Sequence, residues 1–375
     1  MSFNILHVSH TDIRYDNRIL KELTALSSVE GARIHALGVR MDEGNVKGEE
    51  IKNLNISYIE LKSRNFNLNK SIRIVLEVVE LFFKSLLYIF KLRPKVIHCH
   101  DLTPLPVCVF AKLLFNFNLI YDAHELESQK SGITKFLSIT SFYSEMLMMH
   151  YVDFLITVSP SIEKWYKEKF SIRNSALIFN SPFYDQISIL EDKSYLRDKF
   201  NIPEKKKVFI YVGYLANGRG IEDIIEVFKR NQSHVIVFLG YGILENQIVA
   251  ACKESSNIFY HQPVSHNKVV EITSSADFGF CLIENISLSD FFCLPNKLFE
   301  YAFSNIPVIA SDFPDIREFL IKHNIGVCVN DYGIESAIEI VLKSKFKKSN
   351  VIREYSWENQ TVTLINVYRY LINLN

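Results

Sequence analysis

The sequence predicts an α/β protein with two domains, each built on a parallel sheet covered by helices. The chain has 375 residues, which is long for one hydrophobic core, since domains average about 150 residues. Short apolar runs alternate with helical patterns in two successive passes, and such continuous apolar strands are typical of parallel sheets buried on both faces. Between the passes, the turn-forming residues 180–185 (NSPFYD) break the alternation and mark a domain linker.

The first pass predicts an N-terminal domain over residues 1–182. Its expected strands are 4–8, 34–39, 96–100, 119–122, 154–158 and 176–179. Its expected helices are 16–26, 68–92, 105–114, 134–149 and 161–170. Ser159, followed by Pro160 and Glu163, indicates the start of the last of these helices.

The second pass predicts a C-terminal domain over residues 183–355. Its expected strands are 208–212, 234–239, 258–260, 278–283, 308–310 and 326–329. Its expected helices are 221–229, 244–251, 269–274, 296–303, 315–321 and 334–342. The tail, 356–375, reads as a further helix that opens with a serine cap at Ser356. Because ligands bind at the carboxyl ends of parallel strands, we expect a central cleft between the two domains.

Composition excludes several classes of protein. Lysine plus arginine and aspartate plus glutamate both number 42, and this zero net charge argues against nucleic acid as a partner. The six cysteines are scattered without a Cys-x-x-Cys pair, which is typical of reduced core residues in a cytoplasmic protein. The N-terminus lacks a basic stretch followed by an apolar signal core. Residues 71–93 form an amphipathic segment interrupted by charges, which favours a helix packed on a sheet; shallow membrane contact is the alternative.

The segment 294–301 (LPNKLFEY) is the most informative site candidate. Pro295 suits the first turn of a helix, and the unpaired amides beginning at Asn296 favour a phosphate. Lys297 and Glu300 are three residues apart and so share one helix face. A cation and bare amides for a diphosphate, beside a carboxylate for sugar hydroxyls, describe a nucleotide-sugar site. The alternative is a surface helix with an ordinary Lys–Glu pair.

A glycine-containing loop follows the first strand of the second domain. Gly213, Gly218 and Gly220 allow close approach of the backbone, and Arg219 offers a forked donor to diphosphate oxygens. The loop has neither the Gly-x-Gly-x-x-Gly nor the Gly-x-x-x-x-Gly-Lys pattern, which disfavours a dinucleotide oxidoreductase and a P-loop enzyme. A solvated turn arginine is the alternative for Arg219.

Histidines mark the carboxyl ends of two strands in the first domain. His124 follows residues 119–122, where it could donate a hydrogen bond to a sugar hydroxyl or to developing charge; capping of a strand end is the alternative. His98 and His100 share one strand face but show no clear third ligand, so we expect a structural role and no metal site. Asp12, Asp16 and Arg18 are candidates to line the acceptor half of the cleft, and capping equally explains Asp16.

In order along the chain, these motifs resemble the GT-B glycosyltransferases of family 4, many of which build bacterial surface polysaccharides. The matching segments are HTDIRYDNRILKEL (10–23), YDAHEL (121–126), VDFLITVSPSIEKWY (152–166), VGYLANGRGIEDII (212–225), ADFGF (276–280), LPNKLFEYAFSNIPVIASD (294–312) and YSWENQ (355–360). The resemblance implies two Rossmann-like domains, the first on the acceptor side and the second binding the nucleotide-sugar donor. It further implies that Glu300 holds the ribose, that Arg219 and Lys297 hold the diphosphate and that His124 is the active-site histidine. The C-terminal helix would cross back onto the first domain.

The sequence departs from the family at one position. Many members carry a second glutamate eight residues before the one that matches Glu300, and Phe292 stands there instead. Glu284 or Asp290 could contact the sugar in its place, and Glu284 joins Gly213, Gly218, Asn296 and Glu300 as a candidate donor-binding residue. The departure leaves the identity of the donor sugar open.

The resemblance implies a hexosyltransferase that takes a nucleotide-diphosphate sugar, UDP favoured over GDP, and a glycan or lipid-linked acceptor. We expect the reaction to retain the anomeric configuration and to need no metal and no cofactor besides the donor. We also expect the protein to act at the cytoplasmic side of the membrane, with peripheral membrane contact as a further expectation. Two other functions fit the same site, a nucleotide-sugar 2-epimerase and a non-catalytic nucleotide-sugar-binding scaffold.

Overall fold

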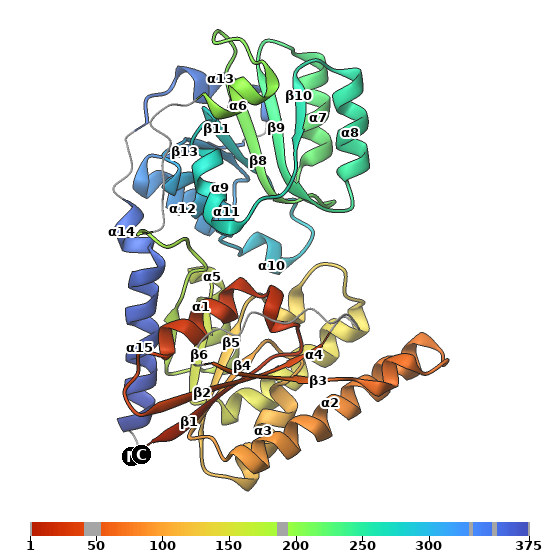
Figure 1. Cartoon of the computed structure of the whole chain (residues 1–375), viewed down its shortest axis with the longest axis vertical. Coiled ribbons are helices and arrows are strands. Elements are labelled where there is room, and N and C mark those ends of the chain that lie inside the picture. The colour runs from red at the N-terminus through yellow and green to blue at the C-terminus, as the bar shows by residue number, and fades with distance from the viewer. Residues whose placement is uncertain (1, 41–53, 186–193, 330–332, 347–350, 374–375) are drawn as a thin grey trace. The chain divides into compact units, whose positions relative to one another are not determined.

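The computed structural model describes residues 2–40, 54–185, 194–329, 333–346 and 351–373. The chain folds into two compact units (Figure 1). The first comprises residues 1–178 together with 360–375, and the second comprises residues 179–359. The sequence places the boundaries at 182/183 and 355/356, close to these positions.

The first unit contains a seven-stranded parallel sheet with the order β3-β2-β1-β4-β5-β6-β7. Its strands are β1 (Phe3–Val8), β2 (Ala32–Val39), β3 (Asn55–Ile59), β4 (Val96–His100), β5 (Asn118–Ala123), β6 (Phe154–Thr157) and β7 (Ser175–Leu177). Its helices are α1 (Asn17–Leu26), α2 (Lys70–Leu92), α3 (Leu105–Leu114), α4 (Lys135–Met148), α5 (Pro160–Phe170) and most of α15 (Trp357–Asn373).

The second unit contains a six-stranded parallel sheet with the order β10-β9-β8-β11-β12-β13. Its strands are β8 (Val208–Tyr214), β9 (Val235–Tyr241), β10 (Ile258–His261), β11 (Phe278–Cys281), β12 (Val308–Ala310) and β13 (Gly326–Cys328). Its helices are α6 (Tyr195–Phe200), α7 (Ile221–Arg230), α8 (Glu245–Glu254), α9 (His266–Thr273), α10 (Leu288–Phe291), α11 (Asn296–Phe303), α12 (Pro314–His323), α13 (Gly333–Lys343) and α14 (Val351–Tyr355).

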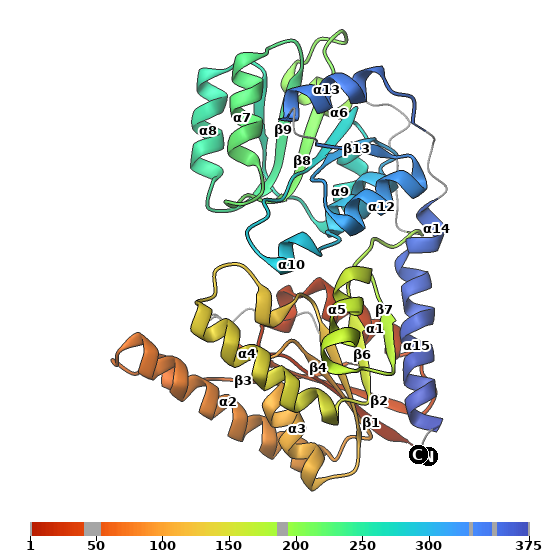
Figure 2. The same cartoon turned by 180° about the vertical axis from the view of Figure 1, so that it is seen from behind.

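In both units helices cover the two faces of the sheet, as the views from opposite sides show (Figures 1 and 2). Along β8, Val208, Ile210 and Val212 join the apolar cluster on one face of the sheet. Phe209 and Tyr211 join the cluster on the other face. Side chains alternate along a strand, so burial of both sets explains why the strands read as continuous apolar runs.

The strand order has a switch point in each unit, where the chain returns to the other side of its first strand. The switch lies between β1 and β4 in the first unit and between β8 and β11 in the second. Connections leave neighbouring strands in opposite directions at such a point and open a crevice at the carboxyl ends. The candidate residues that follow β5, β8 and β11 therefore stand at the ligand-binding edges of their own sheets.

Two local predictions about helix ends have different outcomes. The predicted helix start near Ser159 is confirmed: Ser159 is the N-cap of α5, its hydroxyl accepting from the amide of Ile162 at 3.3 Å, and the helix begins at Pro160, one residue before the predicted 161. Pro295, predicted inside the first turn of α11, lies one position earlier as the N-cap, with extended backbone at φ −73° and ψ 146°.

None of the helices in the described residues is both long enough and apolar enough to span a membrane. The longest is α2, which has 23 residues.

Candidate functional site

The loop between β8 and α7 forms one side of the candidate donor site. Gly213 has φ +121° and Gly220 has φ +66°, conformations that favour glycine. A Cβ on Gly220 would stand 2.6 Å from the Cβ of Leu282, so the loop packs closely against the chain that leaves β11. The carbonyl of Gly218 accepts from the amide of Glu284 at 3.0 Å, which ties the two connections together.

The start of α11 forms the other side. Its N-terminal end has no side-chain cap, and Asn296 is exposed there. The amides at a helix start carry partial positive charge, which suits an anion. Lys297 is partly buried, and its Nζ lies 3.8 Å from the centroid of the Tyr211 ring on β8. The same Nζ would lie 3.8 Å from a Cβ added to Gly213, so the ammonium stands directly over the glycine loop.

The three charged residues predicted for this site all act electrostatically on the thiol of Cys281, at the carboxyl end of β11. Burial raises the pKa of Cys281 to about 12, while the charges of Lys297 and Arg219 lower it and that of Glu300 raises it. Two cations and one carboxylate therefore lie within electrostatic reach of one buried atom at the switch point.

Asp290 is the acid that the structure brings to Arg219. Its Oδ1 lies 3.8 Å from Nη1 of Arg219, and the hydroxyl of Ser287 donates to its Oδ2 at 2.7 Å. Its side chain is 14% exposed, whereas the side chain of Glu284 is exposed. Of the two residues suggested to replace the family glutamate at Phe292, Asp290 is therefore the one paired with Arg219, and the roles of both in binding the sugar stay predictions.

The buried side chain of Tyr301, on α11, connects two strands at this edge of the sheet. Its buried hydroxyl donates to the carbonyl of Phe280 at 2.8 Å and accepts from the amide of Val212 at 3.0 Å. A Cβ on Gly279 would stand 2.6 Å from the Tyr301 ring, so only a glycine leaves room for it. Tyr301 therefore fixes β8, β11 and α11 relative to one another.

His124 lies at the carboxyl end of β5 in the first unit, between two carboxylates. Its Nε2 lies 3.1 Å from Oδ2 of Asp122, and its Nδ1 lies 3.7 Å from Oδ1 of Asp101. Burial opposes protonation, but Asp101 and Asp122 outweigh it and raise the pKa of His124 to about 10. His124 is therefore a cation at neutral pH, with a side chain that is 20% exposed.

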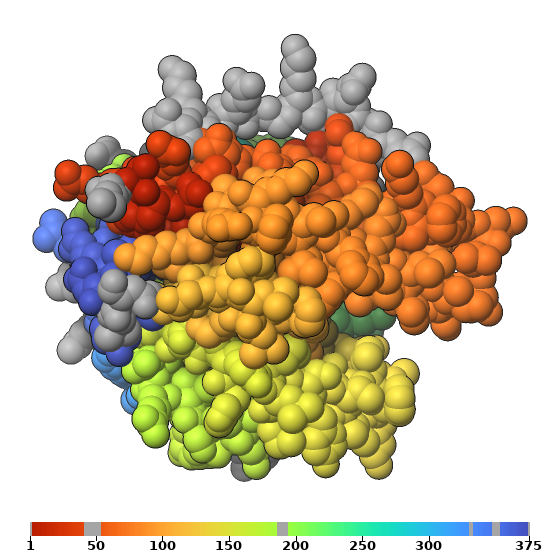
Figure 3. All heavy atoms as spheres, turned by 90° about the horizontal axis from the view of Figure 1, so that it is seen from below, coloured from red at the N-terminus to blue at the C-terminus, as the bar shows by residue number. Residues whose placement is uncertain are grey.

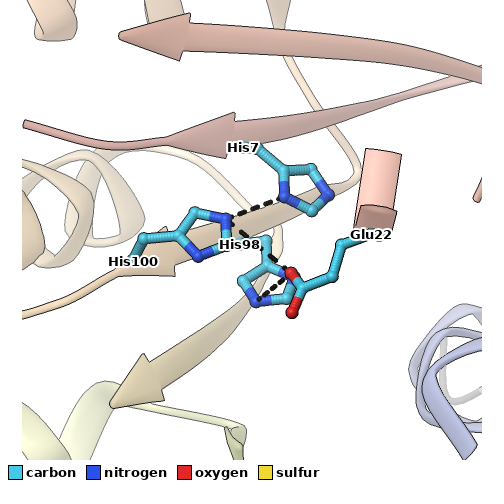
Figure 4. A group of neighbouring side chains, drawn as sticks. All are labelled: His7, Glu22, His98 and His100. Atoms are coloured by element: carbon cyan, nitrogen blue, oxygen red, sulfur yellow. Dashed lines mark hydrogen bonds and ion pairs between the residues drawn. The ribbon is translucent and has the colours of Figure 1, made fainter. Parts of the chain in front are cut away.

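Behind His124 lies a buried histidine cluster, consisting of His7, His98 and His100 with Glu22 (Figure 4). Their ligating atoms lie within 4.8 Å of one another, and His100, Asp122 and His124 form a second such group. The register of β1 with β4 places His7 beside His98. The sequence offered no third ligand for His98 and His100, and the structure corrects this by adding His7 and Glu22.

The geometry of the cluster suits hydrogen bonding better than metal binding. The His98 and His100 rings stack at 4.4 Å with 13° between their planes, and Nδ1 of His7 lies 2.9 Å from Nε2 of His100. Nitrogens that share a proton at this distance direct their lone pairs at each other, whereas zinc ligands direct them at a common centre. The expectation of no metal stays a prediction.

The residues suggested for the acceptor half have structural partners. Arg18, 4% exposed, donates to both oxygens of Asp122 at 2.9 and 3.1 Å and to the carbonyl of Ile178 at 2.7 Å. It is a buried structural cation and not a lining residue, because a guanidinium removed from water needs these acceptors. Asp16 caps α1 by accepting from the amide of Ile19 at 3.1 Å, and Asp12 pairs with Arg14.

Comparisons with known proteins relate the chain to glycosyltransferases. Residues 192–358 match the family model "Glycosyl transferases group 1". Over 239 residues the chain is 23% identical to the putative colanic acid biosynthesis glycosyl transferase WcaI of Escherichia coli K12. This aligned region covers 60% of the present chain and 57% of WcaI.

Two solved structures show the same fold. Sucrose-phosphate synthase from Thermosynechococcus elongatus superposes with a TM-score of 0.81 at 16% identity over the full length of both chains. HepE of Anabaena, in complex with UDP and glucose, superposes with a TM-score of 0.72 at 10% identity over 98% of this chain and 99% of its own. Residues 192–358 are thus similar to the glycosyl transferases group 1 family, and the chain as a whole has the fold of the GT-B glycosyltransferases.

Proposed function

We propose that the protein transfers a hexose from a nucleotide-diphosphate sugar to a glycan or lipid-linked acceptor in surface polysaccharide biosynthesis, on the cytoplasmic side of the membrane. One observation supports the proposal: the charges of Arg219, Lys297 and Glu300 all act on Cys281, which ends β11 at the switch point of the second sheet. Two cations suit a diphosphate, and a carboxylate beside them suits the hydroxyls of a ribose.

In this mechanism the diphosphate is the leaving group. Negative charge grows on it as the glycosidic bond breaks, and Lys297, Arg219 and the free amides of α11 stabilise that charge. Fixed cations of this kind do the work that a divalent ion does elsewhere, so we propose that transfer needs no metal. The family resemblance favours retention of the anomeric configuration.

UDP is the favoured donor nucleotide, since HepE, which shares the fold, was solved with UDP and glucose. The relation to WcaI, named for colanic acid biosynthesis, supports surface polysaccharide as the product class. The donor sugar follows from neither relative.

The decisive experiment measures melting temperature against UDP-, GDP-, CMP- and dTDP-sugars with EDTA present throughout. A ligand that binds only the folded state raises the melting temperature by mass action. We expect a shift with a UDP-sugar that is lost in Arg219→Gln and retained in Arg353→Gln, a control on α14. Incubation with UDP-GlcNAc and no acceptor provides the counter-test, because epimerisation of the sugar would replace the transferase assignment.

Peripheral membrane contact is the second part of the proposal, and it rests on one face of the first unit. Helices α2, α3 and α4 contact one another in sequence, and Figure 3 shows them on one side of this unit, in orange, amber and yellow. The large apolar side chains exposed on them are Ile72, Ile74, Val75, Val78, Val79, Phe83, Leu87, Phe90, Phe110, Leu113, Leu114, Phe136, Leu137, Ile139, Tyr143, Met146 and Leu147. A group of this extent exceeds what isolated surface residues explain.

The charges around this apolar face favour an anionic lipid surface. Lys91 and Arg93 are exposed where α2 ends. The acids of α2 are engaged within the unit: Glu80 accepts from the amide of Ser63 at 2.9 Å and pairs with Lys84 at 2.6 Å. Apolar side chains flanked by cations are typical of surfaces that lie in a membrane interface.

Vesicle co-sedimentation tests this part. We expect the protein to sediment with vesicles that contain anionic phosphatidylglycerol and much less with neutral phosphatidylcholine vesicles. The double substitution Phe83→Ser/Leu87→Ser should abolish sedimentation. Ile321→Ser, which removes a side chain 73% exposed on α12, is the matched control and should leave it unchanged. Equal binding by both variants would exclude this face.

A further inference from the structure

Most of the large apolar side chains exposed in the second unit lie at the carboxyl edge of its sheet. In the described residues of this unit seven such side chains are exposed, and four of them end or follow β8, β9 or β11: Tyr214, Tyr241, Ile243 and Ile286. The other three are Tyr184, Ile321 and Ile340. Single exposed apolar residues need no explanation, but a group of them at the ligand-binding edge of a parallel sheet indicates a binding surface.

Tyr214 and Tyr241 stand side by side within this group, and we call them the tyrosine platform. The register of β8 with β9 pairs the two residues. Their rings meet edge to face, with the centroids 5.6 Å apart and 72° between the planes. Tyr214 is 54% exposed and Tyr241 is 60% exposed, so much of both rings remains accessible to a ligand.

The backbone beneath the tyrosine platform is held in place by close packing. A Cβ on Gly240 would overlap the carbonyl oxygen of Gly213, so the ends of the two strands lie directly against each other. The amide of Leu215 donates to the carbonyl of Tyr241 at 2.8 Å, and the hydroxyl of Tyr260 donates to the carbonyl of Gly240 at 3.1 Å. The platform therefore stands on an ordered edge, and a ligand that binds it needs to order little of the backbone.

The platform adjoins the residues proposed to hold the diphosphate. Nζ of Lys297 lies 3.8 Å from the centroid of the Tyr211 ring, and the hydroxyl of Tyr211 donates to the carbonyl of Tyr214 at 3.1 Å. Tyr214 also directly follows Gly213, over which the same Nζ stands. Tyr241 lies one strand further from β11, and neighbouring strands are about 4.8 Å apart. Because one ribose separates the base of a nucleotide from its diphosphate, a diphosphate at Lys297 brings the base within reach of Tyr241.

We propose that the tyrosine platform is the subsite for the uracil base of the donor, with the base stacked on the ring of Tyr241 and with Tyr214 closing one side. This inference rests on the proposed function and deepens it, because it assigns the residues that recognise the nucleoside part of the donor. Every base has a π face that can stack on an aromatic ring. The position beside Lys297 favours the base over a sugar of the acceptor, since the ammonium fixes the phosphate end of the donor there.

Isothermal titration of the full-length protein with UDP and with pyrophosphate, which lacks the nucleoside, tests the proposal. In Tyr241→Ala the Kd for UDP should rise roughly 5- to 150-fold, the range for loss of one base stacked on an aromatic ring. The Kd for pyrophosphate should not change. Tyr241→Phe keeps the ring and should bind UDP as the wild type does.

Tyr370→Ala is the matched control. Tyr370 is 44% exposed on α15 and meets the Phe154 ring edge to face, with the centroids 6.1 Å apart. Its substitution removes an exposed tyrosine from an aromatic pair outside the second unit. We expect this variant to bind both ligands as the wild type does.

Proton NMR of uridine gives a second readout, which needs no diphosphate. The ring current of an aromatic side chain shifts the protons of a base stacked on it upfield. We therefore expect upfield shifts of H5 and H6 of uridine with the wild type and with Tyr241→Phe, and none with Tyr241→Ala.

Several results would overturn the proposal. These are an unchanged Kd for UDP in Tyr241→Ala, equal losses for UDP and pyrophosphate, or equal losses in Tyr241→Ala and Tyr241→Phe. Bound uridine with unshifted H5 and H6 in the wild type would do the same, and this result decides the matter even if Tyr241→Ala does not fold. In all these cases binding of UDP by the wild type would leave the proposed function standing. A wild type that binds no nucleotide or nucleotide sugar would refute the proposed function itself.

Discussion

Replacement of Lys297 by methionine tests the donor site most directly. Methionine keeps much of the apolar stem and removes the ammonium that lies 3.8 Å from the Tyr211 ring. A charge-assisted hydrogen bond to a diphosphate contributes about 1.5–3 kcal/mol, so the Kd for UDP should rise by roughly 10- to 150-fold. Loss of the cation–π contact should also lower the free energy of unfolding by about 1 kcal/mol.

The assay separates these two effects by comparing two ligands. Isothermal titration with UDP and with uridine should show a large loss of affinity for UDP and little change for uridine, which has no diphosphate. Lys199→Met is the matched control. Nζ of Lys199 lies 5.7 Å from the centroid of the Tyr195 ring on α6, so this substitution also removes a contact between a lysine and an aromatic ring. A loss for uridine equal to that for UDP would refute the assignment of Lys297 to the diphosphate.

Three further outcomes are expected. Tyr301→Phe leaves the buried amide of Val212 without its side-chain partner and should lower the free energy of unfolding by about 2–4 kcal/mol, measured by urea denaturation. Gly240→Ala places a Cβ 1.9 Å from the carbonyl oxygen of Gly213, so it should cost more than about 4 kcal/mol or prevent folding, which circular dichroism would show. Because the pKa of His124 is raised to about 10, its contribution to stability is complete below about pH 6.5 and disappears as the pH rises through 10. His124→Gln should therefore flatten the fall in unfolding free energy between pH 7 and 10, by up to about 1.4 kcal/mol per pH unit; an unchanged slope would show that His124 is neutral.

Local rules explain why most of the fold could be predicted. Strands buried on both faces, such as β8, give unbroken apolar runs that need no knowledge of their neighbours. The edge strand β3, Asn55–Ile59, was missed because it is only partly buried and mixes polar with apolar residues. The short helices α6 and α10, with 6 and 4 residues, fall below the length at which helical periodicity can be recognised.

The candidate donor site could be proposed from the sequence because its parts obey the same local rules. Lys297 and Glu300 share a helix turn, and Arg219 follows a strand in a glycine loop. The histidine cluster was not accessible in this way. His7 and Tyr368 are 361 residues apart, and only the pairing of β1 with β4 and the return of α15 bring them together. The sequence around a tyrosine on a C-terminal helix does not indicate which residues its side chain contacts.

The membership of residues 360–375 in the first unit has a consequence for biosynthesis. Asn118 donates to the carbonyl of Leu371 at 2.7 Å, and Leu364, Tyr368 and Leu371 are completely buried. On the ribosome, the seven-stranded sheet is finished nearly two hundred residues before the helix that covers it emerges. The strands of the second unit are all synthesised before α15, so this unit can fold first, whereas the first unit keeps an uncovered apolar surface until α15 has been synthesised. Chaperones should therefore be needed for the part of the polypeptide that is made first, and truncation before α15 should be as damaging to the first unit as truncation within its sheet.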